Sequence, residues 1–316
     1  MPTPAISVVI PTRNRRQYIG QTLDSVFAQS FKDYEIIVVD DGSTDGTGDS
    51  LVSLIRKKKI RYEHQDARGV SAARNRGVGL ARSPYIAFLD SDDLFLTTKL
   101  EKQMQVFARD PKLGFVHCNF SKFDDQGNDL GIRDTSLFQG QIYPWILHEW
   151  SVLMAMPCMI IRADVLNEVR GFDENMDWAE DLDLWRRIAR RYRVGVVPEV
   201  LVKVRVHSAS ATFERSGGEE GFRRYLDKAF AEDRSLGWAF RQRAYGKMFA
   251  KLGQNLLGEG SHERMSLVRR YSLKAMLTWP LQFGALLAFF ASFLPRRLRH
   301  SLAQKRRCIR YPTSKF

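Results

Sequence analysis

The sequence predicts an α/β fold, a mostly parallel sheet flanked by helices and followed by a helical, basic C-terminal extension. Three observations predict this class. Short β-branched runs alternate with helical patterns across residues 5–110, as they do in βαβ units. Polar residues directly follow the apolar runs, at the strand ends where parallel sheets bind ligands. After Glu263 the chain holds twelve basic residues and no acidic residue, which sets the extension apart.

The elements of the first 110 residues follow in order. Apolar runs predict strands at residues 5–11, 34–43, 60–64 and 85–93. Apolar residues at helical spacing predict a helix over 16–31, and a run of small residues predicts another over 69–81. The second strand ends in Asp-Asp-Gly-Ser, so that Ser43 or Asp45 is placed to cap the helix that follows.

The pattern after residue 110 is less regular. Residues 122–131 form a turn-rich connection. Residues 151–166 and 194–207 carry strand patterns, and a helix over 178–192 begins at an acidic pair. Residues 219–258 are mainly helical in pattern, so strands give way to helices toward the C-terminus.

Charge and cysteine usage limit the class of protein. The net charge is +13, but the first 263 residues hold 37 basic and 36 acidic residues, so the charge belongs to the extension. Hydrophobic residues make up 44% of the chain, which predicts a packed core. Cys118, Cys158 and Cys308 form no Cys-x-x-Cys pair, which argues against a zinc knot or a disulfide framework. These features, with no secretory signal pattern at the N-terminus, favour a cytoplasmic protein.

Three carboxylates, those of Asp90, Asp92 and Asp93, follow the apolar run of the fourth predicted strand. A strand that ends in Asp-x-Asp suits a hard cation such as Mg²⁺ or Mn²⁺ when a substrate diphosphate supplies further ligands. The alternative interpretation is a capped turn, because Asp and Ser favour turns and helix starts.

Six segments occur in the order SVVIPTRNR, VVDDGSTDGT, GVSAARNRG, FLDSDD, RGFDE and AEDLDLWRR. Over roughly residues 5–210 this order resembles that of family 2 glycosyltransferases. The resemblance implies a GT-A, Rossmann-like fold, a nucleotide-sugar donor of the UDP type, Mn²⁺ or Mg²⁺, and inversion at the anomeric carbon. It also implies a role in polysaccharide or lipopolysaccharide biosynthesis. The catalytic domain would span residues 1–215, with a nucleotide-binding half of about 1–110 and an acceptor half of about 111–215.

The resemblance also implies a donor site around the ends of the predicted strands. Its nucleotide-binding residues are Pro11, Thr12, Arg13, Asn14, Asp40, Asp41, Gly69, Arg74, Asp90 and Ser91. Among them, Asp41 would accept a hydrogen bond from the uracil N3–H, Arg74 would pair with diphosphate oxygens, and Asp90 would meet the ribose hydroxyls. Asp92 would be the metal ligand. His207, from a late Arg-x-His element, would contact the metal or the diphosphate.

The helix predicted over 178–192 would carry the base. By the resemblance, Asp181, with Glu180 beside it, takes the proton of the acceptor hydroxyl as that hydroxyl attacks. A like charge nearby raises a carboxyl pKa and suits this task. Without the resemblance, the helix dipole alone would explain acidic residues at a helix start. Trp178 is a candidate for the acceptor platform, with a core aromatic as the alternative.

Residues 276–295 are uncharged and have basic residues on both sides. The stretch is just long enough to cross a bilayer, but Pro280, Gln282 and Gly284 weaken its first half. We therefore predict a helical extension over 216–263 and a membrane-associating tail over 264–316. The tail would act as a monotopic anchor on anionic lipid at the inner face of the plasma membrane, which suits a glycan or lipid-linked acceptor. The alternative is a buried C-terminal helix.

Other classes of protein fit the sequence less well. A sugar-nucleotide nucleotidyltransferase needs a glycine-rich phosphate loop after the first strand, and PTRNRRQ lacks those glycines. A dinucleotide-binding oxidoreductase needs Gly-x-Gly-x-x-Gly at the same place. A non-enzymatic, basic membrane- or nucleic-acid-binding protein would depend on the tail, whose apolar run suits lipid better than nucleic acid. We predict a hexosyl- or N-acetylhexosaminyltransferase that binds no nucleic acid.

Overall fold

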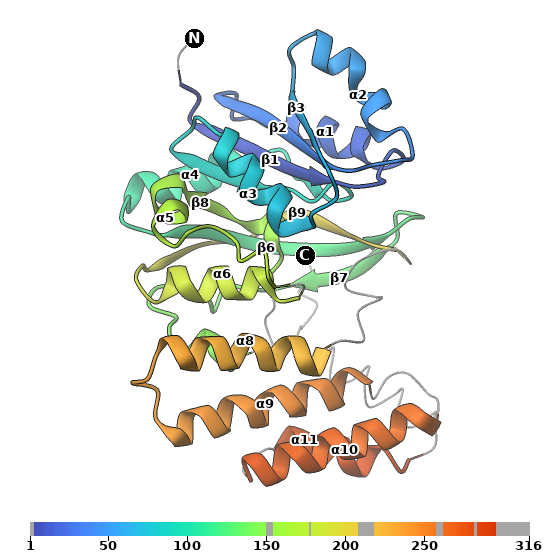
Figure 1. The fold of residues 1–316 in the computed structure, drawn as a ribbon, viewed down its shortest axis with the longest axis vertical. Coiled ribbons are helices and arrows are strands. Elements are labelled where there is room, and N and C mark those ends of the chain that lie inside the picture. The colour runs from blue at the N-terminus through green and yellow to red at the C-terminus, as the bar shows by residue number, and fades with distance from the viewer. Residues whose placement is uncertain are drawn as a thin grey trace. The chain divides into compact units, whose positions relative to one another are not determined.

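The computed structural model of the protein describes residues 3–149, 154–176, 178–207, 218–256, 262–280 and 283–294 (Figure 1). The chain forms two compact units. The first unit comprises residues 1–143 and 153–214, and the second comprises residues 144–152 and 215–316.

A single sheet forms the centre of the first unit. Its strands, within the described residues, are β1 (Ile6–Thr12), β2 (Tyr34–Asp41), β3 (Arg61–Gln65), β4 (Tyr85–Phe88), β5 (Leu94–Phe95), β6 (Phe115–Asp124), β7 (Asp129–Arg133), β8 (Ile160–Arg162) and β9 (Val194–Val206). The order is β3-β2-β1-β4-β8-β6-β9-β5, with β7 paired to β6. Strands β3, β2, β1 and β4 are parallel, as are β6 and β9, whereas β8, β5 and β7 pair antiparallel.

Helices cover both faces of this sheet. They are α1 (Ile19–Phe27), α2 (Thr47–Arg56), α3 (Val70–Leu80), α4 (Lys99–Arg109), α5 (Ala163–Glu168) and α6 (Glu180–Ala189), with a short 3₁₀ helix η2 (Met156–Cys158). Alternate residues of β2 show the two faces: Ile36 and Val38 belong to the core cluster that includes residues of α1, whereas Ile37 and Val39 pack with Ala73 of α3. The predicted α/β fold is confirmed.

Helix α3 explains why the segment 69–81 consists of small residues. It packs on β1 and β2 (Figure 1). A Cβ atom at Gly77 would lie 2.3 Å from Cγ1 of Val9, which is far inside van der Waals contact. The helix therefore approaches the strand at a distance that only glycine permits, and this close approach places the start of α3 beside the ends of β1 and β2.

Two predicted strands differ from the observed elements. The run at 85–93 is strand only to Phe88, and the acidic residues that follow form a turn before β5. Within the run at 151–166, only Ile160–Arg162 is strand among the described residues, because Met156–Cys158 is a 3₁₀ helix and α5 begins at Ala163. Pro157 in the 3₁₀ helix has no N–H to donate to a strand ladder.

The second unit is helical over its described residues. It contains η1 (Trp145–Leu147), α8 (Gly218–Glu232), α9 (Trp238–Leu256), α10 (His262–Thr278) and α11 (Phe283–Ala291). Helix α9 packs against α8, α10 and α11, so the unit has its own core. The predicted helical extension is thus confirmed.

The apolar stretch 276–295 is divided between two elements. It includes the end of α10 and the whole of α11, while residues 281–282 and 295–316, Cys308 among them, lie outside the described residues. No helix among the residues that the structure describes is long and apolar enough to span a bilayer.

Candidate active site

The predicted donor residues lie at the C-terminal edge of the parallel strands. Thr12 ends β1, Asp41 ends β2 and Asp90 follows β4, and these three strands are neighbours in the sheet. Helix α3 begins at the same edge, and ion pairs from its Arg74 bring the turn after β4 and the start of α6 together. In open parallel sheets this edge is where ligands bind.

Asp41 fixes the loop that precedes α3. Its Oδ1 accepts hydrogen bonds from Gln65 Nε2 at 2.7 Å and from the Arg68 backbone N–H at 2.8 Å. Its Oδ2 accepts one from the Gly69 backbone N–H at 2.9 Å, and Gly69 has a φ of +93° that favours glycine. A carboxylate offers about four acceptor positions, so Asp41 keeps one for a ligand.

The loops after β1 and β2 are bonded to each other. Asp40 accepts hydrogen bonds from the Ser43 N–H at 2.8 Å and the Tyr62 hydroxyl at 2.7 Å. The Asn14 N–H donates to Ser43 Oγ at 2.9 Å, and its side-chain Oδ1 accepts from the Thr44 N–H at 2.8 Å. This bonding holds the backbone in place without a ligand.

The other predicted donor residues differ in exposure. Pro11 and Thr12 are buried in β1, Ser91 is buried in the turn after β4, and Arg13 is exposed. Thr12 Oγ1 is buried and has no hydrogen-bond partner among the described residues. A buried hydroxyl without a partner is uncommon in proteins, and at a strand end it offers a polar contact to a ligand.

A cluster of four charged side chains lies between α3 and α6; we call Arg74, Asp90, Glu180 and Asp181 the Arg74 cluster. Arg74 donates from Nη2 to Asp90 Oδ1 at 2.9 Å and from Nη1 to Glu180 Oε1 at 3.1 Å. Burial disfavours the charged guanidinium, but Asp90, Glu180 and Asp181 outweigh burial and raise the pKa of Arg74. The cluster therefore contains one permanent cation and three carboxyl groups.

Asp181 is the carboxyl group of this cluster whose pKa is raised to near neutrality. Burial, and then the charge of Glu180, raise the pKa of Asp181 to about 7, although Arg74 opposes the shift. The Leu182 backbone N–H donates to Asp181 Oδ1 at 2.7 Å, which orients the carboxyl group at the start of α6. A carboxyl group with this pKa exchanges protons at neutral pH.

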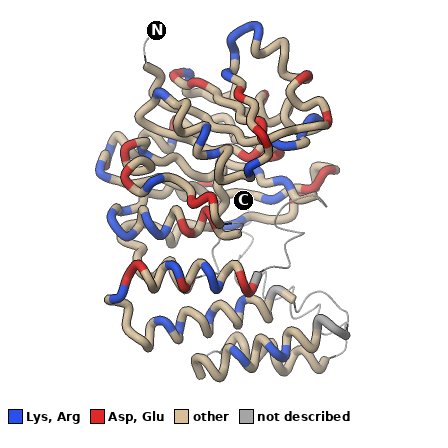
Figure 2. The backbone as a smooth tube through the Cα atoms, viewed as in Figure 1, with Lys and Arg blue, Asp and Glu red and all other residues tan. Residues whose placement is uncertain are grey.

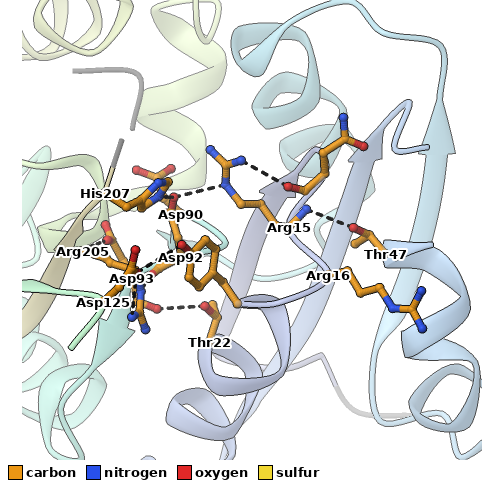
Figure 3. Close-up of polar contacts among 12 residues, drawn as sticks. Arg15, Arg16, Thr22, Thr47, Asp90, Asp92, Asp93, Asp125, Arg205 and His207 are labelled. Carbon is orange, nitrogen blue, oxygen red and sulfur yellow. Dashed lines mark hydrogen bonds and ion pairs between the residues drawn. The ribbon is translucent and has the colours of Figure 1, made fainter. Parts of the chain in front are cut away.

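A second cluster, which we call the Asp92 cluster, consists of Arg15, Asp92 and His207 (Figure 3). Arg15 Nε lies 3.2 Å and His207 Nε2 lies 3.0 Å from the same oxygen, Asp92 Oδ2. The ring of Tyr18 packs on the imidazole of His207 with centroids 5.0 Å apart. Residues that follow β1, β4 and β9 in the chain thus meet at one carboxylate.

Asp93 connects the acidic turn to β9. Its Oδ1 accepts a hydrogen bond from the Arg205 N–H at 2.8 Å, and Arg205 Nε donates to the Asp92 backbone carbonyl at 3.0 Å (Figure 3). Burial, followed by the charges of Asp92 and Asp90, raises the pKa of Asp93 well above its usual range. Asp93 therefore holds the turn in shape, and Asp90 and Asp92 are left to face the edge of the sheet.

The sequence model of the family described as Glycosyl transferase family 2 matches residues 7–170, which is more than half of the chain and includes β1, β2, α3 and the acidic turn. The chain belongs to glycosyl transferase family 2. The match ends before α6, so the family model itself does not include Asp181 or His207.

Curated relatives agree with the family. A protein of Rickettsia felis described as an uncharacterized glycosyltransferase is 36% identical over 209 residues, which is 66% of this chain and 34% of the relative. The putative teichuronic acid biosynthesis glycosyltransferase TuaG of Bacillus subtilis is 38% identical over 130 residues, which is 40% of this chain and 51% of the relative. The matched part thus spans about a third to a half of these relatives.

Solved structures of GT-A glycosyltransferases share the fold. TarS 1–349 of S. aureus in complex with UDP-GlcNAc matches with a TM-score of 0.59 and 18% identity, over 95% of this chain and 92% of the other. The mannosyltransferase PcManGT of Pyrobaculum calidifontis, in complex with GDP-Man and Mn²⁺, matches with a TM-score of 0.57 and 18% identity, over 95% and 88%. At this identity the likeness shows the fold, which the family 2 chain shares with both.

The Asp92 cluster suits a divalent cation of the kind that glycosyltransferases with this fold commonly use. Two ligands on one edge of an octahedron, each about 2.1 Å from Mg²⁺, lie about 3 Å apart, and Asp92 Oδ2 and His207 Nε2 are 3.0 Å apart. The described residues contain no group of three or more His, Cys, Asp and Glu side chains that could hold a metal. A cation with one or two protein ligands takes the rest from substrate phosphates and water, so the residues present fit this mode of binding.

The sequence interpretation did not include Arg15. The segment PTRNRR contains three arginines, and only the fold shows which of them reaches the acidic turn. Trp178 lies half-buried immediately before α6, next to Ala179, which has a positive φ of 61°. In the sequence, Trp178 lies two positions before Glu180 of the Arg74 cluster.

Proposed function

We propose that this protein is an inverting glycosyltransferase that moves a sugar from a nucleotide-sugar, a UDP-sugar in our proposal, to a hydroxyl group of an acceptor. The single observation that carries the proposal is Asp181. Its carboxyl group has a pKa raised to about 7 and lies in the same cluster as Asp90, at the edge of the sheet where family 2 chains bind their donors. A base and a donor-binding carboxylate are thereby brought together by Arg74.

Asp181 would act as the general base. Its ionised form accepts the proton of the acceptor hydroxyl while the hydroxyl oxygen attacks the anomeric carbon and the bond to the nucleoside diphosphate breaks. A base whose pKa lies close to the working pH combines a useful ionised fraction with useful basicity. Glu180, held by Arg74 at 3.1 Å, would keep that pKa high through its charge. One attack from one side inverts the anomeric centre.

The nucleotide would lie along the loops after β1, β2 and β4. Asp41, braced by Asp40, would use its remaining acceptor position for the N3–H of uracil. The nucleotide-binding residues in this proposal remain Pro11, Thr12, Arg13, Asn14, Asp40, Asp41, Gly69, Arg74, Asp90 and Ser91. Asp90 would accept hydrogen bonds from ribose hydroxyls. Because both Nη groups of Arg74 are bonded to carboxylates, Arg74 would support the nucleotide chiefly by holding Asp90.

A divalent cation, Mn²⁺ or Mg²⁺, would be held by Asp92 and His207. When bound, such a cation neutralises charge on the departing diphosphate. Arg15 would pair with Asp92 before the donor arrives, since its Nε lies 3.2 Å from the same carboxylate oxygen. The PcManGT complex contains Mn²⁺ with GDP-Man, which supports a cation in this fold.

We further propose that the acceptor is a glycan or a lipid-linked glycan, that Trp178 forms part of its platform, and that a hexosyl or N-acetylhexosaminyl group is transferred. The name of the Bacillus relative refers to teichuronic acid biosynthesis, which supports a role in polysaccharide or lipopolysaccharide assembly. The basic tail supports a location at the inner face of the plasma membrane, because cationic segments bind anionic lipid.

Titration calorimetry tests the donor part of this proposal. UDP, GDP and dTDP are titrated into the full chain with and without Mn²⁺, and into the Asp92→Asn variant. We expect Mn²⁺-dependent binding of UDP that falls at least about tenfold in the variant, because a ligand and a charge at the diphosphate are lost. Asp33→Asn is the matched control, since Asp33 is exposed and precedes β2 at the opposite edge of the sheet. If none of the three nucleotides bound under either condition, the donor assignment would be wrong.

A further inference from the structure

Helix α11 of the second unit packs its small side chains inward and turns its large apolar side chains outward. Ala285 and Ala288 are fully buried and Ala291 is 8% exposed. The exposed fractions of the large side chains are 73% for Phe283, 41% for Leu286, 57% for Leu287 and 62% for Phe290, and 59% for Phe293 in the turn that follows the helix. A surface helix of a soluble protein normally has the opposite arrangement. We call these five exposed side chains the α11 apolar face.

The inner packing determines this orientation. Ala288 and Ala291 pack in one cluster with Met265 and Val268 of α10. A Cβ atom at Gly284 would lie 2.5 Å from the Gln254 side-chain nitrogen on α9. The buried positions of α11 are all alanine, and the phenyl and isobutyl groups of the apolar face lie on the other side of the helix. The α11 apolar face therefore lies on the outside of the helical unit.

The charged residues that border the α11 apolar face along the chain are all basic. The chain has no charged residue between Lys274 and Arg296, and every charged residue after Glu263 is basic. Figure 2 shows basic positions but no acidic position along the described parts of α10 and α11. On α10, Arg270 is exposed. The guanidinium carbon of Arg269 lies 4.3 Å from the centre of the Phe293 ring, so a cation borders the apolar face directly.

This combination identifies the kind of partner. A lipid leaflet with anionic headgroups offers acyl chains to the apolar side chains and phosphates to the cations, and each nearby cation contributes about 1 kcal/mol. A second copy of the chain would bring its own basic tail against this one, and a nucleic acid would leave the phenylalanines without apolar contacts. Helix α11 has nine residues, about 14 Å, which is too short to cross a hydrocarbon core of about 30 Å.

We propose that the α11 apolar face inserts into an anionic membrane leaflet. Helix α11 lies in the plane of the interface, with Phe283, Leu287 and Phe290 among the upper acyl chains and Arg269 and Arg270 at the phosphates. The inference goes beyond the proposed transfer reaction and does not depend on it. It also assigns the insertion to a folded helix that packs on α9 and α10, rather than to the sequence after residue 294.

The test is co-sedimentation of the full chain with vesicles of phosphatidylcholine alone or mixed with phosphatidylglycerol. We expect binding that requires phosphatidylglycerol and weakens with salt. The double variant Leu287→Ser and Phe290→Ser should bind at least about tenfold more weakly, because two apolar side chains no longer leave water. Leu137→Ser is the control, since Leu137 is 74% exposed in the first unit, and it should bind as the parent does.

Both substituted side chains are exposed, so the double variant should keep the circular dichroism, melting temperature and UDP affinity of the parent. Unchanged UDP affinity also separates this test from the test of the donor site. Equal vesicle binding by parent and double variant would overturn the proposal. It would indicate instead that the basic residues of the tail bind the protein to the vesicles. A parent that sediments as a dimer, does not bind vesicles, and becomes a monomer in the double variant would overturn it in favour of contact between copies.

Discussion

Helix α6 contributes residues to two charge clusters. Acidic groups outnumber basic groups in the first, and basic groups outnumber acidic groups in the second. In the Arg74 cluster, one guanidinium interacts with the carboxyl groups of Asp90, Glu180 and Asp181. In the second, which we call the Asp183 cluster, the fully buried Asp183 accepts from Arg186 Nη2 at 2.6 Å and from Arg187 Nε at 2.8 Å.

The difference distinguishes the acid for which we propose a catalytic function from a structural acid on the same helix. Two guanidinium groups pair with the buried Asp183, which holds the helix in place. Burial, and then the charge of Glu180, raise the pKa of Asp181 to about 7, because the single cation Arg74 does not offset them. Asp181 and Asp183 lie two positions apart in the sequence, yet substitution by asparagine should lower activity at Asp181 and lower stability at Asp183.

The largest expected effect is that of Asp181→Asn on activity. Loss of a general base typically costs 10²–10⁴-fold in rate, so we expect release of UDP from a UDP-sugar to fall by about that factor. The affinity for UDP should stay within about twofold, since Asp181 is not in the proposed nucleotide site. The measurement is steady-state kinetics together with calorimetry. An Asp181→Asn variant with more than about a tenth of the parent rate would contradict the assignment.

The matched substitution Asp183→Asn should act on stability. It leaves the buried guanidinium of Arg186 without its carboxylate, and breaking a buried ion pair costs about 3–5 kcal/mol. Urea unfolding of the parent, Asp183→Asn and Asp181→Asn measures the free energies of unfolding. Only Asp183→Asn should have a lower free energy of unfolding than the parent. If Asp181→Asn were destabilised by as much, the contrast between the two clusters would be lost.

Arg74→Met sharpens the comparison by removing the single cation of its cluster. Arg74 favours the ionised form of Asp181, so its loss should raise the pKa of Asp181 and move the acidic limb of the pH–rate profile upward by about one unit. Activity at pH 6 should therefore fall several-fold more than activity at pH 8.5. Arg76→Met is the control, because Arg76 lies on the same helix but pairs with Glu63 in an exposed site. A uniform loss at all pH values would assign Arg74 a purely structural role.

A further expected effect is on the pH dependence of stability. The folded-state pKa of Asp181, about 7, is raised above its unfolded value of about 3.9. The folded protein thus binds more protons between these values, and its stability decreases as pH rises from about 4 to 7. Asp181→Asn removes this decrease, so the variant should gain on the order of 2 kcal/mol over the parent between pH 5 and pH 8. Urea unfolding at both pH values measures the gain, and an unchanged difference would contradict the raised pKa.

The sequence predicted the parts of the site that are local in the chain. Strands β1, β2 and β4 were recognisable because buried parallel strands are continuous apolar runs, and the predicted donor residues lie at their polar ends. The pairing of Arg74 with Glu180 was not predictable, because 106 positions separate them and their approach depends on how α3 and α6 pack. The same holds for Arg15, which is one of three similar arginines until the fold places it at Asp92.

The orientation of α11 could also not be predicted from sequence patterns. Composition identified an uncharged run, but alanine, leucine and phenylalanine are mixed in it without a polar side that would mark the solvent face. Only the packing of Ala285 and Ala288 against α9 and α10 shows which side is left outside. The strand predicted over 151–166 failed for a related reason, because apolar content alone does not distinguish a short strand from a 3₁₀ turn that contains proline.

The pH dependence of sugar transfer to water tests the central claim most directly. UDP release from UDP-glucose and UDP-N-acetylglucosamine is followed with saturating Mn²⁺ from pH 5 to pH 9, so that no acceptor is needed. Because Asp181 must be ionised to accept a proton, we predict a rate that rises tenfold per pH unit below an inflection near 7 and is level above it. A rate that is independent of pH between 5 and 8 would contradict the assignment of Asp181 as the base.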